Sequence, residues 1–316
     1  MSTVRKVLIA LAVLVVCMAS AGGIYYLDFH HGPASAAVAS QKKKPSTTPT
    51  CLQKKGSFCT GVALKAVTRE DLASFTRGTR VFPAIVEYYQ AFGKPFSKIN
   101  ARRIALLGAR PLIQINPHKI DLADIAAGHY DAYLRQYALA VKSFGHQVVL
   151  SFGHEMNGTW STWGLPFTRP AVFVAAWRHI HDVFAAEHVG NVTWSWDISH
   201  TAHPPRPWWP GSKYTDWVGI DGYLRPGQTF AGQFWKSINT VRKFSNKPVI
   251  IAETAVAPGK DQIKQMNGLF AGARERHLVG LVWFDVNKKA KWKIDNAKQE
   301  AAFRQDVWGS PPRHIR

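Results

Sequence analysis

Short apolar runs recur at regular intervals along this chain of 316 residues, from residue 61 onward. Each run is rich in β-branched and aromatic residues, a composition typical of buried parallel strands. The eight predicted strands cover residues 61–67, 80–89, 109–116, 147–155, 191–197, 216–223, 247–254 and 279–286. The spacing leaves room for a helix between most successive strands.

Between the strands, apolar residues recur at helical spacing. The clearest examples are residues 130–145 (YDAYLRQYALAVKSFG) and 169–188 (RPAVFVAAWRHIHDVFAAEH). Thr168 and Pro170 are the expected cap and first-turn proline of the second helix. Alternating strands and helices imply a parallel sheet, and eight such units in about 250 residues match a closed (β/α)8 TIM barrel. The other candidate, an open doubly wound sheet, would need a glycine-rich phosphate turn after its first strand. The sequence has none there.

The N-terminal region differs in composition from the rest of the chain. Residues 7–27 carry no charge and follow two basic residues, so residues 1–27 are predicted to be a signal peptide or a membrane anchor. Residues 28–50, rich in Ser, Ala, Pro, Thr and Lys, are predicted to be a flexible linker. The single folded domain is assigned to residues 51–310, and it is expected to be secreted or anchored outside the membrane.

Cysteine content and charge bear on the compartment and the partners. Cys51 and Cys59 are expected to form a disulfide at the start of the domain, in an oxidising compartment. The chain carries 40 Lys and Arg against 20 Asp and Glu, a formal net charge of +20, and most of this excess belongs to the domain. Such a charge favours anionic surfaces or substrates, or it is simply a solvated basic face suited to an anionic envelope or an acidic habitat. No nucleic-acid-binding module is visible, so no specific nucleic-acid partner is expected.

Carboxylic acids close two of the predicted strands. Glu155 ends the fourth strand and Glu253 ends the seventh. The C-terminal ends of barrel strands meet at one mouth, so these side chains are expected to lie across the barrel axis from each other. Two carboxyl groups about 5 Å apart suit retaining glycoside hydrolysis, in which one protonates the leaving oxygen and the other attacks the anomeric carbon. Their mutual repulsion would raise the pKa of the proton donor.

Tryptophan is abundant, and several of the 12 tryptophans lie at or just after strand ends. Their ring faces can stack against the C–H faces of sugars. Trp160, Trp163, Trp196 and Trp283 are therefore predicted to line a sugar-binding cleft. Trp194 is expected to be core filler instead, because its side chain should alternate with that of Trp196.

The stretch FGHEMNGTWSTWG, residues 152–164, resembles the acid/base signature of glycoside hydrolase family 26, which contains β-mannanases and some β-glucanases and xylanases. The segments EYYQAFGKPF, DWVGIDGY, KPVIIAET and LVWFD resemble the family's second, sixth, seventh and eighth strands. The resemblance implies a retaining (β/α)8 glycosidase with Glu155 as acid/base, Glu253 as nucleophile and Tyr223 orienting the nucleophile. The further contacts that it implies with the sugar or the glutamates come from His154, Asn157, Trp160, Trp163, Trp283 and His118.

These observations predict a retaining endo-glycosidase that hydrolyses a β-linked polysaccharide. A β-mannan or a β-glucan is the leading choice of polymer, and the basic surface leaves an anionic envelope glycan as a further choice. We expect no cofactor and no metal. The expected partners of the monomer are the polysaccharide and, if the N-terminal segment is not cleaved, the membrane. Two alternatives use the same barrel: a noncatalytic carbohydrate-binding protein, and a transglycosylase acting on cell-envelope glycan. Noncatalytic barrels usually lose one carboxylate, and both are present here, which favours an enzyme.

Overall fold

Eight parallel strands form a closed barrel in the computed structural model, which describes residues 50–53, 56–288 and 290–308. Neighbouring strands follow one another in chain order, and the last strand pairs with the first. The strands are β1 (Cys59–Ala63), β2 (Ile85–Ala91), β3 (Arg110–Asn116), β4 (Val148–Phe152), β5 (Val192–Ser199), β6 (Trp217–Asp221), β7 (Val249–Thr254) and β8 (Gly280–Phe284). The predicted (β/α)8 barrel and all eight predicted strands are confirmed.

Barrel closure depends on a close approach between β8 and β1. The register of this pair runs from Cys59 opposite Gly280 to Ala63 opposite Phe284. A Cβ atom at Gly280 would lie 1.9 Å from the Cys59 carbonyl oxygen, so only glycine fits at this position. Pairing with β8 also explains why β1 begins earlier than its sequence pattern predicted.

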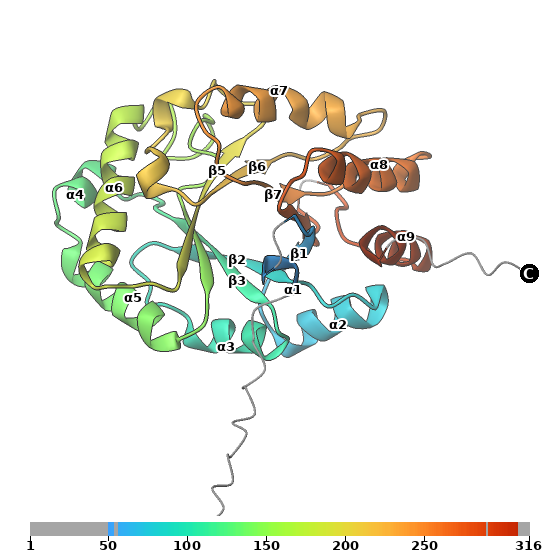
Figure 1. Ribbon diagram of the computed structural model, residues 1–316, viewed down its shortest axis with the longest axis horizontal. Helices are drawn as coiled ribbons and strands as arrows, with labels where there is room; N and C mark the ends of the chain where they lie inside the picture. Colours follow the sequence, from blue (N-terminus) through green and yellow to red (C-terminus); the bar gives the residue numbers. More distant parts are fainter. Residues whose placement is uncertain (1–49, 54–55, 289, 309–316) are drawn as a thin grey trace, which may run out of the picture. The chain divides into compact units, whose positions relative to one another are not determined.

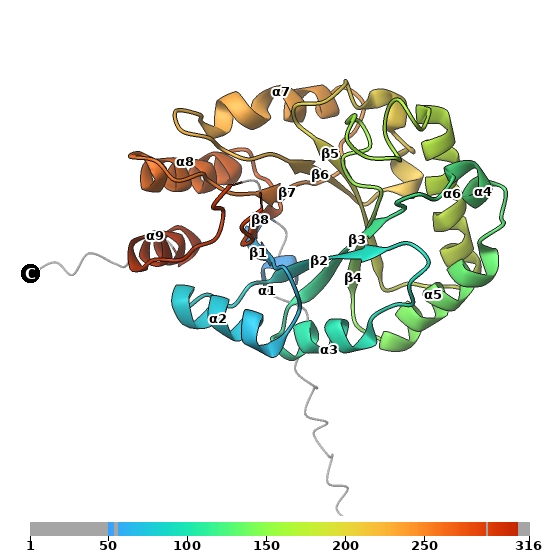
Figure 2. The same ribbon diagram turned by 180° about the vertical axis from the view of Figure 1, so that it is seen from behind.

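Helices α2 to α9 form an outer ring around the barrel, and the short α1 lies beside β1 inside that ring, as the two opposite views in Figures 1 and 2 show. The helices are α1 (Thr50–Gln53), α2 (Arg69–Thr79), α3 (Lys98–Leu106), α4 (Leu122–Ala126), α5 (Asp131–Phe144), α6 (Pro170–Ala186), α7 (Phe230–Arg242), α8 (Gln262–Glu275) and α9 (Ala297–Trp308), with short 3-10 turns at Arg206–Trp208 and Ser212–Tyr214. The ring closes where α9 meets α2, since Phe303 and Phe75 pack edge to face with 5.7 Å between ring centroids.

The start of α6 differs from the prediction. Arg169 occupies the N-cap position and makes no side-chain cap bond, while Pro170 lies in the first turn as predicted. The expected cap residue, Thr168, donates its hydroxyl to the Thr162 carbonyl at 2.9 Å instead. Proline has no N–H that needs a partner at this position. Thr168 is therefore available to hold the loop that follows β4.

The Cys51–Cys59 disulfide is confirmed, and it ties α1 to the start of β1. The predicted signal or anchor segment (1–27) and all but the last residue of the predicted linker (28–50) lie outside the described residues. Within the part of the chain that the structure describes, no helix combines the length and apolar character needed to cross a membrane.

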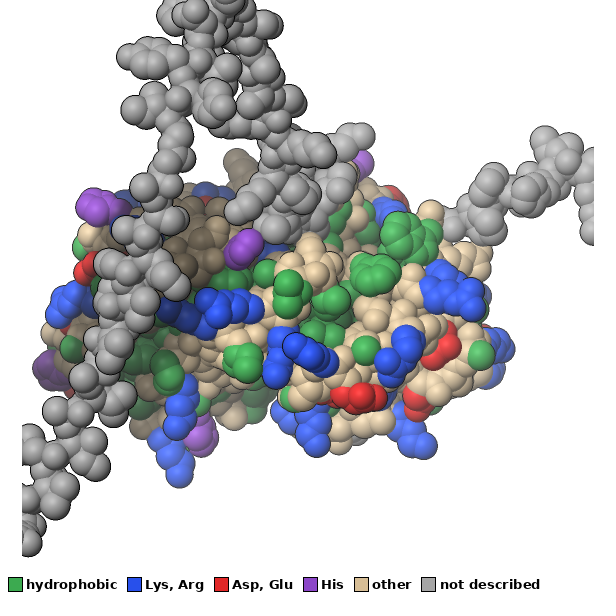
Figure 3. Space-filling view, turned by 90° about the horizontal axis from the view of Figure 1, so that it is seen from below, with side chains coloured by type: hydrophobic (Ala, Val, Ile, Leu, Met, Phe, Trp, Pro, Cys, Tyr) green, Lys and Arg blue, Asp and Glu red, His purple; other side chains and the backbone are tan. Residues whose placement is uncertain are grey.

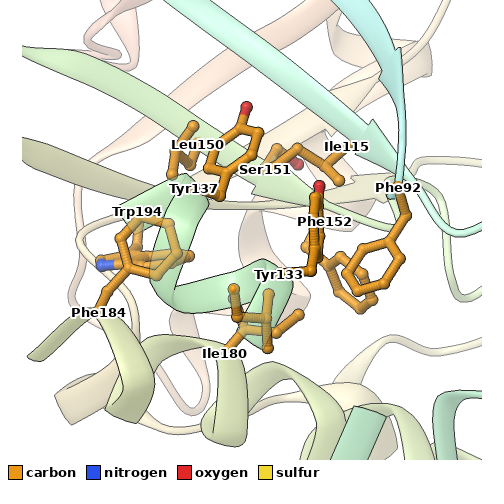
Figure 4. Close-up of a pocket in the computed structure, with 11 residues that line it drawn as sticks. Phe92, Ile115, Tyr133, Tyr137, Leu150, Ser151, Phe152, Ile180, Phe184 and Trp194 are labelled. Atoms are coloured by element: carbon orange, nitrogen blue, oxygen red, sulfur yellow. The ribbon is translucent and has the colours of Figure 1, made fainter. Parts of the chain in front are cut away.

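A small cavity lies in the apolar shell between strands and helices. Figure 4 shows this cavity, which lies between α5, α6 and the strands β3 to β5 and has a volume of about 10 Å³. Tyr133, Phe152, Ile180 and Trp194 are among the residues that line it. A space of this size holds about one water molecule. It is therefore a packing gap, and the candidate site lies elsewhere.

Candidate active site

A pocket of about 900 Å³ opens at the C-terminal ends of the strands, where barrel enzymes carry their chemistry. Its lining includes Lys65, Tyr89, Asn116, His154, Glu155, Trp160, Trp163, Ser199, Asp221, Tyr223, Arg225, Glu253, Phe284, Lys288 and Trp292. Every strand of the barrel contributes through its end or the loop that follows. Both predicted catalytic glutamates thus line the same pocket.

Two tyrosine hydroxyls hold the carboxylate of Glu253 at the end of β7. Tyr89 of β2 donates to Oε1, and Tyr223, which follows β6, donates to Oε2. Burial raises the pKa of the Glu253 carboxyl, whereas the two hydroxyls and the nearby Lys288 ammonium lower it. Because both oxygens have fixed partners, the carboxylate is held in one orientation, as positioned catalysis requires.

Glu155 lies in a sharp turn just after β4. Its φ angle is +55°, in the left-handed region that costs a non-glycine residue about 1–2 kcal/mol. The Glu155 N–H donates to the Asp197 carbonyl at 2.8 Å, which holds this turn against β5. Trp160 donates its indole N–H to Glu155 Oε2 at 2.7 Å. Backbone strain of this kind is concentrated at functional sites, which fits a catalytic role for Glu155.

His154 is held in the neutral form beside Glu155. Its Nδ1 lies 3.0 Å from Asn116 Oδ1, and its ring lies between those of Tyr89 and Trp163, with centroids 5.6 and 6.0 Å away. Burial lowers the pKa of His154 to about 4. Because an amide oxygen can only accept, Nδ1 carries the hydrogen and Nε2 is left as an acceptor.

A layer of buried polar side chains lies one step deeper in the barrel. Gln114 Nε2 donates to Glu87 Oε1 and to Asp197 Oδ2, at 2.9 Å in each case. Burial raises the pKa of Glu87 well above its ordinary range, and the charge of Glu253 raises it further. Burial raises the pKa of Asp197 as well. Protonation of this layer removes negative charge from the neighbourhood of Glu253.

Asp221 ends β6 opposite Glu253 in the register of β6 and β7. Its side chain is fully buried, and neither carboxyl oxygen has a hydrogen-bond partner among the described residues. Burial raises the Asp221 pKa well above its ordinary range, and the charges of Glu253 and Glu155 raise it further. Over the same described ranges, no group of three or more His, Cys, Asp or Glu is arranged to hold a metal ion. Burial of a carboxyl without such partners favours its protonated form.

The prediction that Trp196 lines the cleft is wrong. Residues two apart in a strand point to the same side. Asp197 of β5 faces the lumen, where it bonds Gln114, so Trp194 and Trp196 both face outward. Trp196 is fully buried and packs edge to face on Trp209, with 5.0 Å between centroids. Both tryptophans belong to the core, and the expected alternation between them does not exist.

Trp283 is also a core residue, contrary to the prediction. Its ring packs on Phe303 of α9 at 5.7 Å, and its indole N–H donates to the Trp292 carbonyl at 3.1 Å. The pocket is lined instead by the next residue, Phe284, and by Trp292 in the following loop. Successive strand residues point to opposite faces, which explains the difference between Trp283 and Phe284.

Asn157 and His118 do not line the pocket. The Asn157 amide is buried, donates to the Ser199 and His203 carbonyls at 2.9 Å, and accepts the Ser199 N–H at 2.9 Å. It therefore braces the loops after β4 and β5 rather than contacting a sugar. His118 is exposed beyond β3, and the polar lining residue from that strand is Asn116.

The structure brings the other predicted binding residues to the pocket: His154, Trp160, Trp163 and Tyr223. Sequence reasoning missed Tyr89 and Trp292. Tyr89 lies in the segment EYYQAFGKPF, but the pair of adjacent tyrosines does not show which one faces the lumen. Trp292 lies in a loop, where no periodicity predicts the direction of a side chain.

A closed barrel with glutamates from β4 and β7 in one aromatic-lined pocket is the arrangement expected of a barrel glycoside hydrolase. Residues 130–308, more than half of the chain, match the sequence profile of glycosyl hydrolase family 26. The chain therefore belongs to glycosyl hydrolase family 26.

The chain is also similar in sequence to an endoglucanase and to a mannosidase. The chain is 30% identical over 224 residues to endoglucanase H of Acetivibrio thermocellus, covering 63% of this chain and 24% of that protein. It is 27% identical over 165 residues to mannan endo-1,4-β-mannosidase A and B of Caldalkalibacillus mannanilyticus, covering 49% and 30%. The match thus spans less than a third of either relative. Among solved structures, the mannanase BCman of Bacillus subtilis superposes with a TM-score of 0.64 at 15% identity, over 83% of this chain and 89% of that one, a likeness of fold.

Proposed function

We propose that the protein is a retaining endo-glycosidase that hydrolyses a β-linked polysaccharide of the β-mannan or β-glucan type. The observation that carries this proposal is the arrangement of two glutamates in one pocket, with Glu253 fixed by Tyr89 and Tyr223. The names of the relatives, an endoglucanase and a mannosidase, support the substrate class.

In the first step, Glu155 donates a proton to the leaving glycosidic oxygen while Glu253 attacks the anomeric carbon. The bond to the leaving sugar breaks as the Glu253 ester bond forms, which gives a glycosyl-enzyme. Glu253 has to be ionised to attack. The hydroxyls of Tyr89 and Tyr223 and the ammonium of Lys288 stabilise that ionised form against the cost of burial.

In the second step, Glu155 takes a proton from a water molecule whose oxygen attacks the anomeric carbon. The ester bond breaks, and Glu253 leaves as a carboxylate. The two tyrosine hydroxyls are already in place to donate hydrogen bonds to the returning carboxylate. Two successive inversions at the anomeric carbon give retention of configuration.

The two alternatives make different demands on these residues. A noncatalytic carbohydrate-binding barrel has no use for a carboxylate with both oxygens fixed beside a second glutamate, so this arrangement argues against it. A transglycosylase acting on cell-envelope glycan would use the same residues and differ only in the attacking hydroxyl. Product analysis separates it from a hydrolase.

The test follows reducing-end release from mannan, glucomannan and mixed-linkage glucan by wild type, Glu155→Gln and Glu253→Gln. We expect release from at least one polymer and a loss of about 1,000-fold or more in each variant. Glu70→Gln, an exposed residue of α2, is the matched control and should keep full activity. NMR of the first product should show the β-anomer. Initial release of the α-anomer, or full activity in Glu253→Gln, would overturn the proposal.

We also propose that the domain acts outside the cytoplasmic membrane, either secreted or anchored. The Cys51–Cys59 disulfide supports this location, because disulfides persist in oxidising compartments. Protease treatment of intact cells should digest an anchored form, and the culture medium should contain a secreted form. Recovery of all the protein in the cytoplasmic fraction would contradict the proposal.

A further inference from the structure

Three basic side chains line the mouth of the pocket, and we refer to them as the rim cations. Lys65 follows β1, Arg225 follows β6 and Lys288 follows β8, and all three are exposed. Considering the residues that the structure describes, no carboxylate forms an ion pair with any of them. Their charges are therefore available to a bound ligand.

The rim cations lie along one arc of the barrel mouth. The strands β6, β7, β8 and β1 are consecutive in the barrel, so this arc also carries Glu253. Glu155 and the 53% exposed ring of Trp160 come from the other side, after β4. A polysaccharide that crosses the pocket between the two glutamates passes beside the rim cations.

The acids of the pocket do not cancel this charge at its outer edge. The Glu253 carboxylate is already bonded to two tyrosine hydroxyls, Asp221 is fully buried with a raised pKa, and Glu155 lies after β4, on the other side of the pocket. Lys288 lies near enough to lower the pKa of both Glu253 and His154. The outer part of the arc is therefore electropositive.

The whole domain adds to this field. The formal net charge of the chain is +20, most of it in the domain, and burial raises the pKa of Glu87 and Asp221 well above their ordinary ranges, which favours their neutral forms. Figure 3 shows Lys and Arg side chains spread across one side of the domain, where Asp and Glu are sparser. A field of this sign concentrates anionic chains near the pocket.

We propose, building on the function proposed above, that the preferred substrate is a β-linked polysaccharide carrying anionic groups, which the rim cations bind. Carboxylate, sulfate and phosphate groups share the required chemistry. The reacting sugar lies between Glu155 and Glu253, which would repel a negative substituent. The anionic groups therefore belong to sugars on either side of it, and a neutral polymer offers the rim cations only hydroxyls.

The experiment compares β-1,4-glucomannan with the same polymer after oxidation of part of its C6 hydroxymethyl groups to carboxylates. Affinity gel electrophoresis of the full chain measures binding, and reducing-end release measures cleavage. At low ionic strength we expect about tenfold tighter binding and about tenfold higher kcat/KM for the oxidised polymer, from a few exposed charge pairs. The preference should decline in 1 M NaCl, where the screening length is about 3 Å.

A pair of triple variants tests the rim cations themselves. The first variant carries Lys65→Gln, Arg225→Gln and Lys288→Gln. The matched control carries Arg102→Gln, Lys236→Gln and Lys243→Gln, which removes the same charge from exposed positions on and just after α3 and α7, outside the pocket lining. The oxidised-to-neutral ratio should fall from about tenfold toward one in the first variant and persist in the control. An equal fall in both would overturn the role of the rim cations.

Binding and cleavage separate this inference from the proposed function. A preference for the neutral polymer in both measurements would overturn the inference and leave the hydrolase intact. If the oxidised polymer binds more tightly but no cleavage depends on Glu253, the hydrolase proposal is overturned and the rim cations remain as a binding site. Neither cleavage nor preferential binding would overturn both. Sulfated and phosphorylated glucomannan in the same gels distinguish the sources of negative charge.

Discussion

The two hydroxyls that hold Glu253 give the sharpest test of the proposed nucleophile. Tyr89→Phe and Tyr223→Phe each delete one donor while keeping the ring. The remaining ring at position 223 can still pack on Trp292, which lies 4.9 Å away between centroids. Thermal unfolding close to that of wild type is the control that the fold is intact.

The expected loss follows from the charge on the acceptor. A hydrogen bond to a charged group contributes about 1.5–3 kcal/mol, which corresponds to a fall in kcat/KM of about 10- to 150-fold in each variant. Burial raises the pKa of Glu253 and the hydroxyls lower it, so loss of either hydroxyl raises this pKa. Because Glu253 attacks as the carboxylate, the acidic limb of the pH profile should move to higher pH.

The assay is kcat/KM as a function of pH for wild type, both single variants and the double variant. Since Tyr89 and Tyr223 act on one carboxylate, their effects should be non-additive, with a coupling free energy of about 0.5–3 kcal/mol. A Tyr223→Phe enzyme within about twofold of wild type and with an unmoved acidic limb would refute the reasoning, since such a change corresponds to less than 0.5 kcal/mol.

Three further predictions follow from burial and exposure. Asp221→Asn should stabilise the protein by about 1–3 kcal/mol at neutral pH, because an amide cannot ionise and therefore avoids the cost of burying a carboxylate. The folded-state pKa of Asp221 is raised, so its carboxyl contributes stability below the ordinary pKa of about 3.9, and this contribution is lost as pH rises through the folded pKa. In urea unfolding, the stability gained by the Asn variant over wild type should therefore grow with pH. An equal gain in stability at all pH values would contradict this. Trp283→Ala should lower stability by about 3–5 kcal/mol. Trp160→Ala should change stability by only about 0.5 kcal/mol but lower kcat/KM about tenfold. Calorimetry measures the first effect and kinetics the second, and a larger loss of stability in Trp160→Ala than in Trp283→Ala would contradict the placement of Trp283 in the core and Trp160 at the pocket. Replacing Cys51 and Cys59 by Ser opens a loop of sequence separation 8 and should cost about 2–3 kcal/mol, or about 5–10 °C in Tm; an unchanged Tm by differential scanning fluorimetry would show that the bridge does not stabilise the fold.

The sequence predicted the barrel well because its signals are local. Eight apolar runs and the helices between them set the strand number and order, and the ends of those runs place Glu155 and Glu253 at one mouth. The direction of individual side chains was harder to predict, because both faces of a parallel barrel strand are buried. In β5, Asp197 points into the lumen and Trp196 points into the outer shell, and both side chains are fully buried. Burial alone therefore did not show which of the two faces the pocket.

Long-range hydrogen bonds were beyond any local pattern. Tyr89 and Glu253 are 164 residues apart, and their contact exists only because β2 and β7 face each other across the lumen. Asn157 carried the residue type expected of a sugar-binding group, but its amide is fully used by the loop after β5. Motif resemblance therefore located the two candidate catalytic glutamates, while the tertiary fold determines which side chains contact them.

The distribution of charge ties the buried and the exposed parts of the site together. Within the barrel, burial raises the pKa of Glu87 and Asp221, and protonation of either relieves the repulsion that ionised Glu253 would otherwise feel. At the mouth, Lys288 lowers the Glu253 pKa from the solvent side. In the proposed mechanism, the ionised form of Glu253 is therefore favoured by neutral carboxyls deeper in the barrel, by the two tyrosine hydroxyls and by the Lys288 ammonium. If the same cation binds an anionic substrate, substrate charge and nucleophile ionisation are coupled through Lys288.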